Sequence, residues 1–188
     1  MLAIAINDIP LTLQTAPELF SPGGLDAGTA AMLSCINLLP SDKVLDLGCG
    51  YGVVGIYAAK CIGAERVTMC DIDPLAVEQA RQNAALNNVP DVKIVQSDGF
   101  RSIDDFGFTV ILSNPPYHAD FSVPKHFIEK GFNRLAIGGR MLMVTKRRDW
   151  YKNKFISIFG GVKIQEVDGY FVFIAEKRTQ SFASKKSR

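Results

Sequence analysis

The residues best suited to chemistry in this chain are four in succession, Asn114, Pro115, Pro116 and Tyr117. They follow the apolar run 108–112, whose composition predicts a buried strand. Two adjacent prolines cannot continue a strand ladder, and each keeps the residue before it extended, so the strand should end in a stiff ledge. An amide side chain, free carbonyls and an aromatic plane suit the binding of a flat ring that carries an amino group. A proline loop with a buried tyrosine would have the same sequence.

A second group of residues lies in the glycine-rich stretch 48–52, between an apolar strand at 43–47 and a helix at 53–61. Its glycines, Gly48 and Gly50 among them, permit a tight turn and let a ligand approach the backbone. The Gly-x-Gly-x-Gly spacing differs from that of dinucleotide sites, and no Lys-Ser or Lys-Thr follows to hold phosphates. Asp46, just before the turn, would repel a pyrophosphate but suits a cationic ligand with an amino group. An ordinary glycine-rich turn remains the alternative.

Two further carboxylates follow predicted strands. Asp71 ends the strand at 66–70, a position at which an acid commonly binds the two hydroxyl groups of a ribose. Asp98 follows the strand at 92–96 and could accept a hydrogen bond from an adenine amino group, although an Asp before Gly is also typical of a simple turn. Asp73, by contrast, precedes Pro74 and is expected to cap the next helix.

All of these groups stand at the carboxyl ends of predicted strands, where open α/β sheets bind ligands. From about Phe20 to Lys177 the chain resembles the class I S-adenosylmethionine-dependent methyltransferases. The resemblance implies S-adenosyl-L-methionine as cofactor, and it matches the Asn114–Tyr117 ledge to the N/D-P-P-Y/F motif of enzymes that methylate nitrogen on a planar group. It implies cofactor contacts for the methionine part at Asp46, Gly48 and Gly50, for the ribose at Asp71, for the adenine at Asp98, and at Asn114 beside the reacting methyl.

Two stretches resemble one group of these enzymes more closely, the guanine-N2 enzymes of the ribosomal RNA small-subunit methyltransferase C type. Residues 20–29 are similar to its F-S-x-x-x-L-D-x-G-S/T stretch, and residues 113–118 to its S-N-P-P-F-H. This chain has Tyr117 where that group often has Phe, and it lacks the second, degenerate domain copy of the larger members. An adenine-N6 enzyme acting on RNA or DNA, a glutamine-N5 protein methyltransferase and a non-catalytic RNA-binding module therefore stay open as alternatives. His118 is expected to position the substrate or to pack locally.

The rest of the pattern predicts helices at 125–137 and 149–159, a strand at 140–145, and a hairpin of strands 163–167 and 170–176 around Asp168-Gly169. Gly138-Gly139 is expected to end the first of these helices. The resemblance adds the strand number and order. The expected fold is a Rossmann-like, seven-stranded, mostly parallel sheet with one antiparallel strand and helices on both faces. We expect one methyltransferase domain over 1–188, with an N-terminal extension at 1–25 and a basic, disordered tail at 179–188.

Composition narrows the class of protein further. At 188 residues and 47% hydrophobic content the chain is long enough for one well-buried core. Its four cysteines form no C-x-x-C pair and its two histidines lie far from them, so no metal site is expected. Unpaired cysteines and the lack of a signal peptide or a membrane-spanning run indicate a cytoplasmic protein.

Charge is distributed unevenly along the chain. Residues 1–139 contain nine Lys and Arg against 15 Asp and Glu, whereas residues 140–188 contain 12 against four. The basic part includes Lys146-Arg147-Arg148 and the tail. Such a segregated field attracts polyanions, so RNA, and ribosomal RNA or the small subunit in particular, is the expected partner. A solvated helix face and a frayed tail would explain the same pattern.

Overall fold

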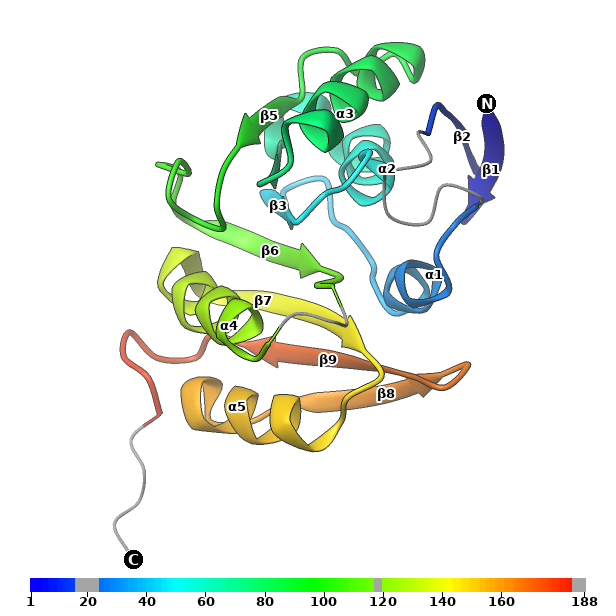
Figure 1. Ribbon diagram of the computed structural model, residues 1–188. Helices are drawn as coiled ribbons and strands as arrows, with labels where there is room; N and C mark the ends of the chain where they lie inside the picture. The colour runs from blue at the N-terminus through cyan, green and yellow to red at the C-terminus, as the bar shows by residue number, and fades with distance from the viewer. Residues whose placement is uncertain (16–23, 117–119, 184–188) are drawn as a thin grey trace, which may run out of the picture.

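The computed structural model describes residues 1–15, 24–116 and 120–183 of the chain, and Figure 1 shows their arrangement. Within these residues the elements follow one another along the chain as β1 (Leu2–Ile6), β2 (Ile9–Leu13), α1 (Ala27–Ser34), β3 (Val44–Leu47), α2 (Val53–Ile62), the short 3-10 helix η1 (Ala64–Arg66), β4 (Val67–Asp71), α3 (Pro74–Leu86), β5 (Lys93–Gln96), β6 (Phe108–Ser113), α4 (Ser122–Arg134), β7 (Leu135–Thr145), α5 (Asp149–Phe159), β8 (Lys163–Val167) and β9 (Tyr170–Glu176).

A seven-stranded sheet in the order β5-β4-β3-β6-β7-β9-β8 forms the centre of the fold. Strands β3 to β7 pair in parallel, and β9 runs antiparallel to both of its neighbours, β7 and β8. The predicted fold class, with one antiparallel strand, is therefore confirmed. The short β1–β2 hairpin forms a separate two-stranded sheet.

Helices cover both faces of the sheet (Figure 1). On one face α1, α2, α3 and the β1–β2 hairpin bury one hydrophobic cluster, and on the other face α4 and α5 lie side by side over a second cluster. Successive residues of the inner strands belong alternately to the two clusters. Leu142 and Val144 belong to the first, whereas Met141 and Met143 belong to the second. Burial on both faces explains why these strands read as continuous apolar runs in the sequence.

The order of the strands brings the chemical groups together. The chain leaves β3 for β4 and β5 on one side, then crosses to β6 on the other side of β3. The register pairs Asp46 of β3 with Met69 of β4 and with Leu112 of β6, so the carboxyl ends of all three strands lie level with one another. This reversal of strand order is where open α/β sheets bind ligands.

The helix predicted at 125–137 differs from the structure at both ends. Helix α4 ends at Arg134, and the chain continues from Leu135 directly into the eleven-residue strand β7, so Gly138-Gly139 lies inside a strand. Gly138 donates to the carbonyl of Lys177, and Gly139 accepts from the N–H of Lys177. A Cβ on Gly139 would lie only 2.8 Å from the carbonyl oxygen of Phe108. The two glycines therefore permit close backbone approach at an irregularity of the ladder, a role that the sequence pattern does not distinguish from a helix end.

The N-terminal hairpin is held to the body by two buried amides, Asn83 in α3 and Asn87 at the C-cap of that helix. Asn83 accepts from the N–H of Gln14, and Asn87 accepts from the N–H of Thr12 while donating to the carbonyl of the same residue. Both strands of the hairpin lie within residues 1–25, for which the sequence analysis expected only an N-terminal extension. The turn between them uses Asn7 and Asp8 at positive φ, as a two-residue type I′ hairpin requires.

Toward the other end of the chain, Phe182 and Ala183 contact α4 and α5. Phe182 packs edge-on against Phe132, with ring centroids 5.1 Å apart, and the N–H of Ala183 donates to the carbonyl of Ile158. The disordered tail at 179–188 was predicted from composition, which gives no sign of this contact between Phe182 and Phe132. The rest of the tail, 184–188, lies outside the described residues.

Candidate functional site

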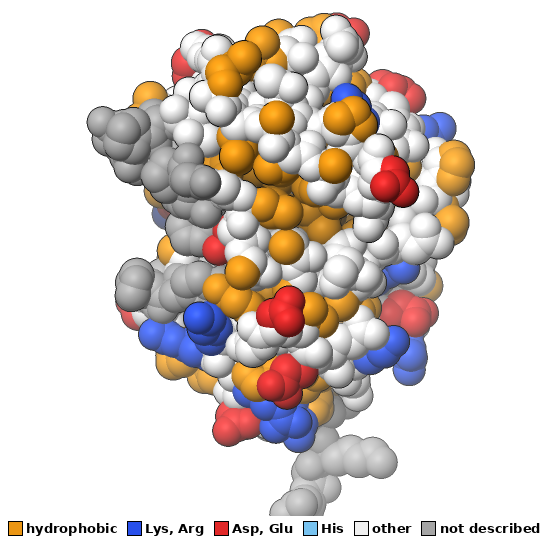
Figure 2. Space-filling view, turned by 90° about the vertical axis from the view of Figure 1, so that its right-hand side faces the viewer, with side chains coloured by type: hydrophobic (Ala, Val, Ile, Leu, Met, Phe, Trp, Pro, Cys, Tyr) orange, Lys and Arg blue, Asp and Glu red, His pale blue; other side chains and the backbone are white. Residues whose placement is uncertain are grey.

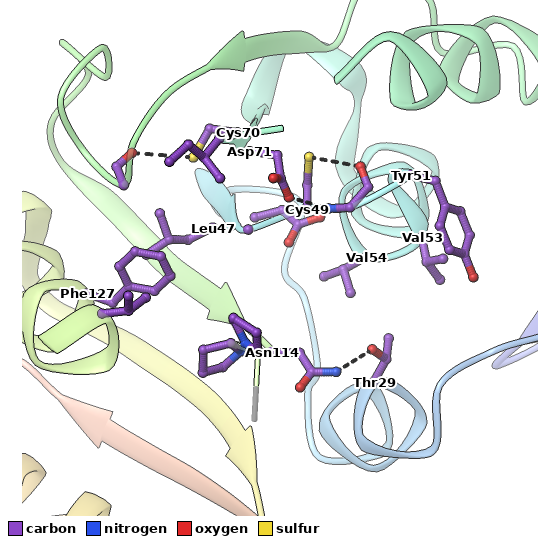
Figure 3. A pocket seen from close by; sticks show the side chains of 18 of the residues that line it. Thr29, Leu47, Cys49, Tyr51, Val53, Val54, Cys70, Asp71, Asn114 and Phe127 are labelled. Carbon is purple, nitrogen blue, oxygen red and sulfur yellow. Dashed lines mark hydrogen bonds between the residues drawn. The ribbon is translucent and has the colours of Figure 1, made fainter. Parts of the chain in front are cut away.

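A cavity of about 340 Å³ opens at the carboxyl edge of the sheet, next to the reversal of strand order. Its wall is formed by the first residues of α1, the glycine loop after β3, the end of β4, residues 97–99, the ledge at 114–116 and two side chains of α4. Hydrophobic side chains surround a hollow on this face of the molecule (Figure 2), and polar groups stand among them (Figure 3). A largely apolar pocket with a few fixed polar groups is the usual form of a small-molecule site.

The glycine loop is fixed by backbone hydrogen bonds to the neighbouring strand. The N–H groups of Gly48 and Cys49 both donate to the carbonyl of Cys70, each at 2.9 Å. Gly48 and Gly50 have φ of +77° and +53°, in the left-handed region that a side chain would strain. Apart from Gly50 and its two neighbours in the chain, no heavy atom of the described residues lies within 4 Å of the Cβ position of Gly50, so a ligand has room to approach the backbone there.

Asp46 is buried below this loop. Its Oδ2 accepts from the N–H of Gly55 in α2 at 2.8 Å. Burial raises the pKa of the Asp46 carboxyl to about 7, the Gly55 hydrogen bond lowers it, and the nearby charge of Asp71 adds to the increase. An acid with this pKa changes its charge readily near neutral pH, and a cation placed beside it would favour the carboxylate.

The two acids after β4 and β5 both line the cavity, but they differ in their partners. Asp71 accepts from the N–H of Gly50 at 2.8 Å through Oδ2, and from the N–H of Asp73 at 3.0 Å through Oδ1. Each oxygen keeps one lone pair for a further donor. Asp98 is half exposed and pairs with Arg101 at 3.3 Å. Asp71 is thus part of the loop's own framework, and Asp98 is not.

Asn114 stands at the end of β6 with its amide held on one side only. Its Nδ2 donates to Asp26 Oδ2 at 2.7 Å and to Thr29 Oγ1 at 3.0 Å, both at the start of α1 (Figure 3 shows the contact with Thr29). Its Oδ1 is buried and has no hydrogen-bond partner in the described part of the chain. A buried acceptor left without a donor costs on the order of 1–3 kcal/mol, so an incoming N–H group would be stabilising.

The structure brings together most of the residues singled out from the sequence. Residues 46, 48, 50, 71, 98 and 114–116 all line the cavity. Tyr117 and His118 lie outside the described residues, as does the first part of the 20–29 stretch. Sequence reasoning gave no role to Asp26 and Thr29, although both stand in the quoted L-D-x-G-T pattern. The signal was there, since an Asp three residues before Thr at a helix start is a typical N-cap.

Comparison with known proteins supports the interpretation of the cavity. Residues 10–174 match the family model described as the methyltransferase small domain. This chain belongs to that family. The family assignment confirms the predicted methyltransferase, and the matched range includes the glycine loop, both strand-end acids and the ledge.

Relatives of this methyltransferase are similar over nearly its whole length. Ribosomal RNA small subunit methyltransferase C of Pseudomonas putida is 32% identical over 180 residues, which cover 93% of this chain and 54% of that protein. The solved structure of a 16S rRNA N2 methyltransferase (RsmC) of T. thermophilus, in complex with AdoMet and guanosine, has a TM-score of 0.85 at 26% identity over 94% of this chain and 50% of that one. This chain therefore spans about half the length of these relatives.

A methyltransferase of Pyrococcus furiosus shares the fold over most of both chains. Its TM-score is 0.71 at 20% identity, over 90% of each.

Among the described residues no group of three or more His, Cys, Asp or Glu side chains could hold a metal ion. Likewise, none of the helices in those residues combines the length and the apolar character needed to cross a membrane.

The perturbed carboxyl of Asp46 predicts a pH dependence of stability. The folded carboxyl holds its proton more tightly than the unfolded one, whose pKa is 3.8, so its contribution is fully present below that pH and is lost as the pH rises to about 7. Asp46→Asn removes this titration and keeps an oxygen for the Gly55 N–H. We expect wild type to lose roughly 3 kcal/mol more than the variant between about pH 4.5 and pH 8 in urea unfolding. Equal pH dependence of the two proteins would contradict the raised pKa.

Proposed function

We propose that this chain is an S-adenosylmethionine-dependent N-methyltransferase, with 1–188 as a single domain, that acts on the exocyclic amine of guanine in ribosomal RNA. The observation that carries the proposal is the buried Oδ1 of Asn114 at the rim of the cavity, which has no hydrogen-bond partner among the described residues. An oxygen of this kind suits a substrate that brings an N–H group. The relatives named for rRNA methylation support the choice of substrate.

The cavity fits the cofactor in its distribution of charge. Asp46 and the open backbone at Gly48 and Gly50 suit the cationic methionine end, Asp71 has lone pairs left for the two ribose hydroxyls, and Asp98 lies on the rim for the adenine amino group. When bound, S-adenosylmethionine supplies a methyl group on a positively charged sulfur. The negative charges of the site complement that ligand, whereas they would repel a phosphate.

The ledge supplies what a weakly nucleophilic amine needs. The lone pair of an exocyclic amine is delocalised into the ring. Asn114 Oδ1 and the Pro115 carbonyl would accept its two hydrogens, favour a pyramidal nitrogen and direct the lone pair toward the methyl group. Both oxygens are fixed dipoles that stabilise the positive charge developing on nitrogen. Because Asn114 Oδ1 is out of contact with solvent here, the amine can reach it only when neighbouring groups shift. Tyr117 is proposed to stack on the base.

A cationic surface next to the ledge supports RNA as the substrate. Lys146, Arg147 and Arg148 are exposed just after β7, the strand that pairs with β6. The guanidinium of Arg147 lies 5.0 Å from the ring centre of Phe121, and Phe121 stacks on Trp150 with centroids 4.4 Å apart. Most of the Lys and Arg side chains visible in Figure 2 lie below the hollow. Cations beside aromatic planes are the groups that bind single-stranded RNA. A ribosomal RNA substrate would also locate the protein in the cytoplasm.

The test of the function is transfer of labelled methyl from S-adenosylmethionine to ribosomal RNA, small subunits, DNA and protein from a strain lacking the gene. We expect N2-methylguanosine by nucleoside mass spectrometry. Asn114→Ala should abolish this transfer, because the acceptor for the amine is lost, while cofactor affinity stays within about an order of magnitude. Detection of N6-methyladenosine or of labelled protein would show that the substrate is adenine or a protein instead of guanine. Cofactor binding without transfer to any fraction would refute the proposal.

Asp71→Ala should weaken cofactor binding, but the loss has two sources because Asp71 also holds Gly50. Comparing S-adenosylhomocysteine with its 2′,3′-dideoxy analogue separates them. Wild type should prefer the natural ligand by about 10-fold or more, as expected for hydrogen bonds to a charged group, and Asp71→Ala should bind both alike. Titration calorimetry measures the four affinities. A preference retained in the variant would exclude the ribose contact.

The cationic surface predicts a change in the salt dependence of RNA binding. Each phosphate contact contributes about 0.7 to the slope of log K against log salt for a single strand. The double variant Lys146→Ala/Arg147→Ala should therefore flatten the slope by about 1.4, measured by fluorescence anisotropy with labelled RNA. Arg66→Ala, which removes an exposed charge at the opposite edge of the sheet, is the control and should leave the slope unchanged. Equal slopes for all three proteins would show that Lys146 and Arg147 do not contact the RNA phosphates.

A further inference from the structure

The two ends of a carboxamide have nearly the same shape, so the direction of the Asn114 amide depends on its partners. The Asp26 carboxylate can only accept hydrogen bonds, and it lies 2.7 Å from one end of the amide. That end must therefore be the NH2 group, and the oxygen is left for the other side. Thr29 Oγ1, 3.0 Å from the same nitrogen, occupies the second hydrogen.

Asp26 is itself fixed by the helix that it begins. It is the N-cap of α1, with extended backbone angles, and its Oδ2 accepts from the N–H of Thr29 at 2.8 Å. The same oxygen accepts from Asn114. One carboxylate oxygen thus joins the first turn of α1 to the end of β6, segments 88 residues apart in the chain. Thr29 is 7% exposed, so little water competes for these bonds.

The direction of the amide matters for the proposed chemistry. An oxygen that faces the substrate accepts from an amine and leaves its lone pair free. An NH2 group in its place would donate to that lone pair and remove the nucleophile. The negative charge of Asp26 behind the amide also draws the NH2 hydrogens and polarises the oxygen, which strengthens it as an acceptor.

We propose that Asp26 and Thr29 are positioning residues that hold the amide of Asn114 with its oxygen toward the acceptor, and so restrict the site to groups that bring an N–H. The inference rests on the proposed function for the identity of that acceptor, but not for the direction of the amide. Neither residue touches the reacting atoms. Each acts through Asn114.

Two substitutions of Asp26 separate this role from helix capping. Ser, Asn and Asp cap helices about equally well, so a capping role alone predicts that Asp26→Ser and Asp26→Asn behave alike. The side chain of Asn carries an oxygen at the same distance from the backbone as Asp and can accept from Asn114. The Ser side chain is one bond shorter, so its hydroxyl does not reach Asn114. We expect kcat to fall about 10- to 100-fold in Asp26→Ser and clearly less in Asp26→Asn, with cofactor affinity unchanged in both. Equal kcat values in the two variants would overturn the proposal.

A second pair tests Thr29 without changing the cap, which uses its backbone N–H. Thr29→Val keeps the shape of the side chain and removes the oxygen, and Thr29→Ser restores an oxygen. We expect kcat about 3- to 10-fold lower in Thr29→Val and close to wild type in Thr29→Ser, at unchanged cofactor affinity and melting temperature. Thr29→Val with full kcat would remove Thr29 from the proposal.

A measurement without turnover keeps this inference separate from the proposed function. The side-chain NH2 resonances of Asn114 are identified in ¹⁵N–¹H spectra by their loss in Asn114→Ala. We expect their hydrogens to be protected from exchange in wild type and in Asp26→Asn, and unprotected in Asp26→Ser. If wild type methylates no acceptor, the proposed function fails. The spectra would still test whether Asp26 and Thr29 hold the amide of Asn114 in one direction. Unprotected Asn114 hydrogens in wild type would refute the positioning role whatever the activity.

Discussion

The site depends on the central place of β3, which is hydrogen-bonded to β4 on one side and to β6 on the other. Parallel pairing in one register forces the three strands to end at the same level. The loop after β3, the acid at the end of β4 and the ledge after β6 are therefore neighbours, although they come from three distant parts of the sequence.

Much of this arrangement could be predicted from the sequence. Asp46 lies near the end of an apolar run, and Gly48, Gly50, Asp71 and Asn114 come after such runs. The rule that parallel strands end at one edge was enough to place them together. Proline and glycine gave the clearest local signals, because they limit the backbone whatever surrounds them. The strand number and order came from resemblance to a family, since apolar runs alone do not say which strands are neighbours.

What could not be predicted depends on contacts between distant residues. Gly138-Gly139 looks like a helix end, and only the approach of Lys177 and the Phe108 carbonyl shows that it belongs to a strand. Likewise Asp26 reads as a helix cap, and its second partner, Asn114, is 88 residues away. The buried amides of Asn83 in α3 and of Asn87 at its C-cap bind the N-terminal segment, and their partners are equally remote in the sequence. The partners of such polar residues cannot be predicted from the periodicity of the sequence. In the site, the contact between Asp26 and Asn114 is of this kind.

The carboxyl of Asp46 has a consequence for the thermodynamics of binding. With a pKa of about 7 it is close to half protonated at neutral pH. A cationic ligand would lower that pKa and expel about half a proton, so the observed heat of binding would depend on the ionisation enthalpy of the buffer. The amino group that Asp46 suits would keep its charge whether or not the sulfur carries a methyl group, so Asp46 would regain its proton only when the ligand leaves.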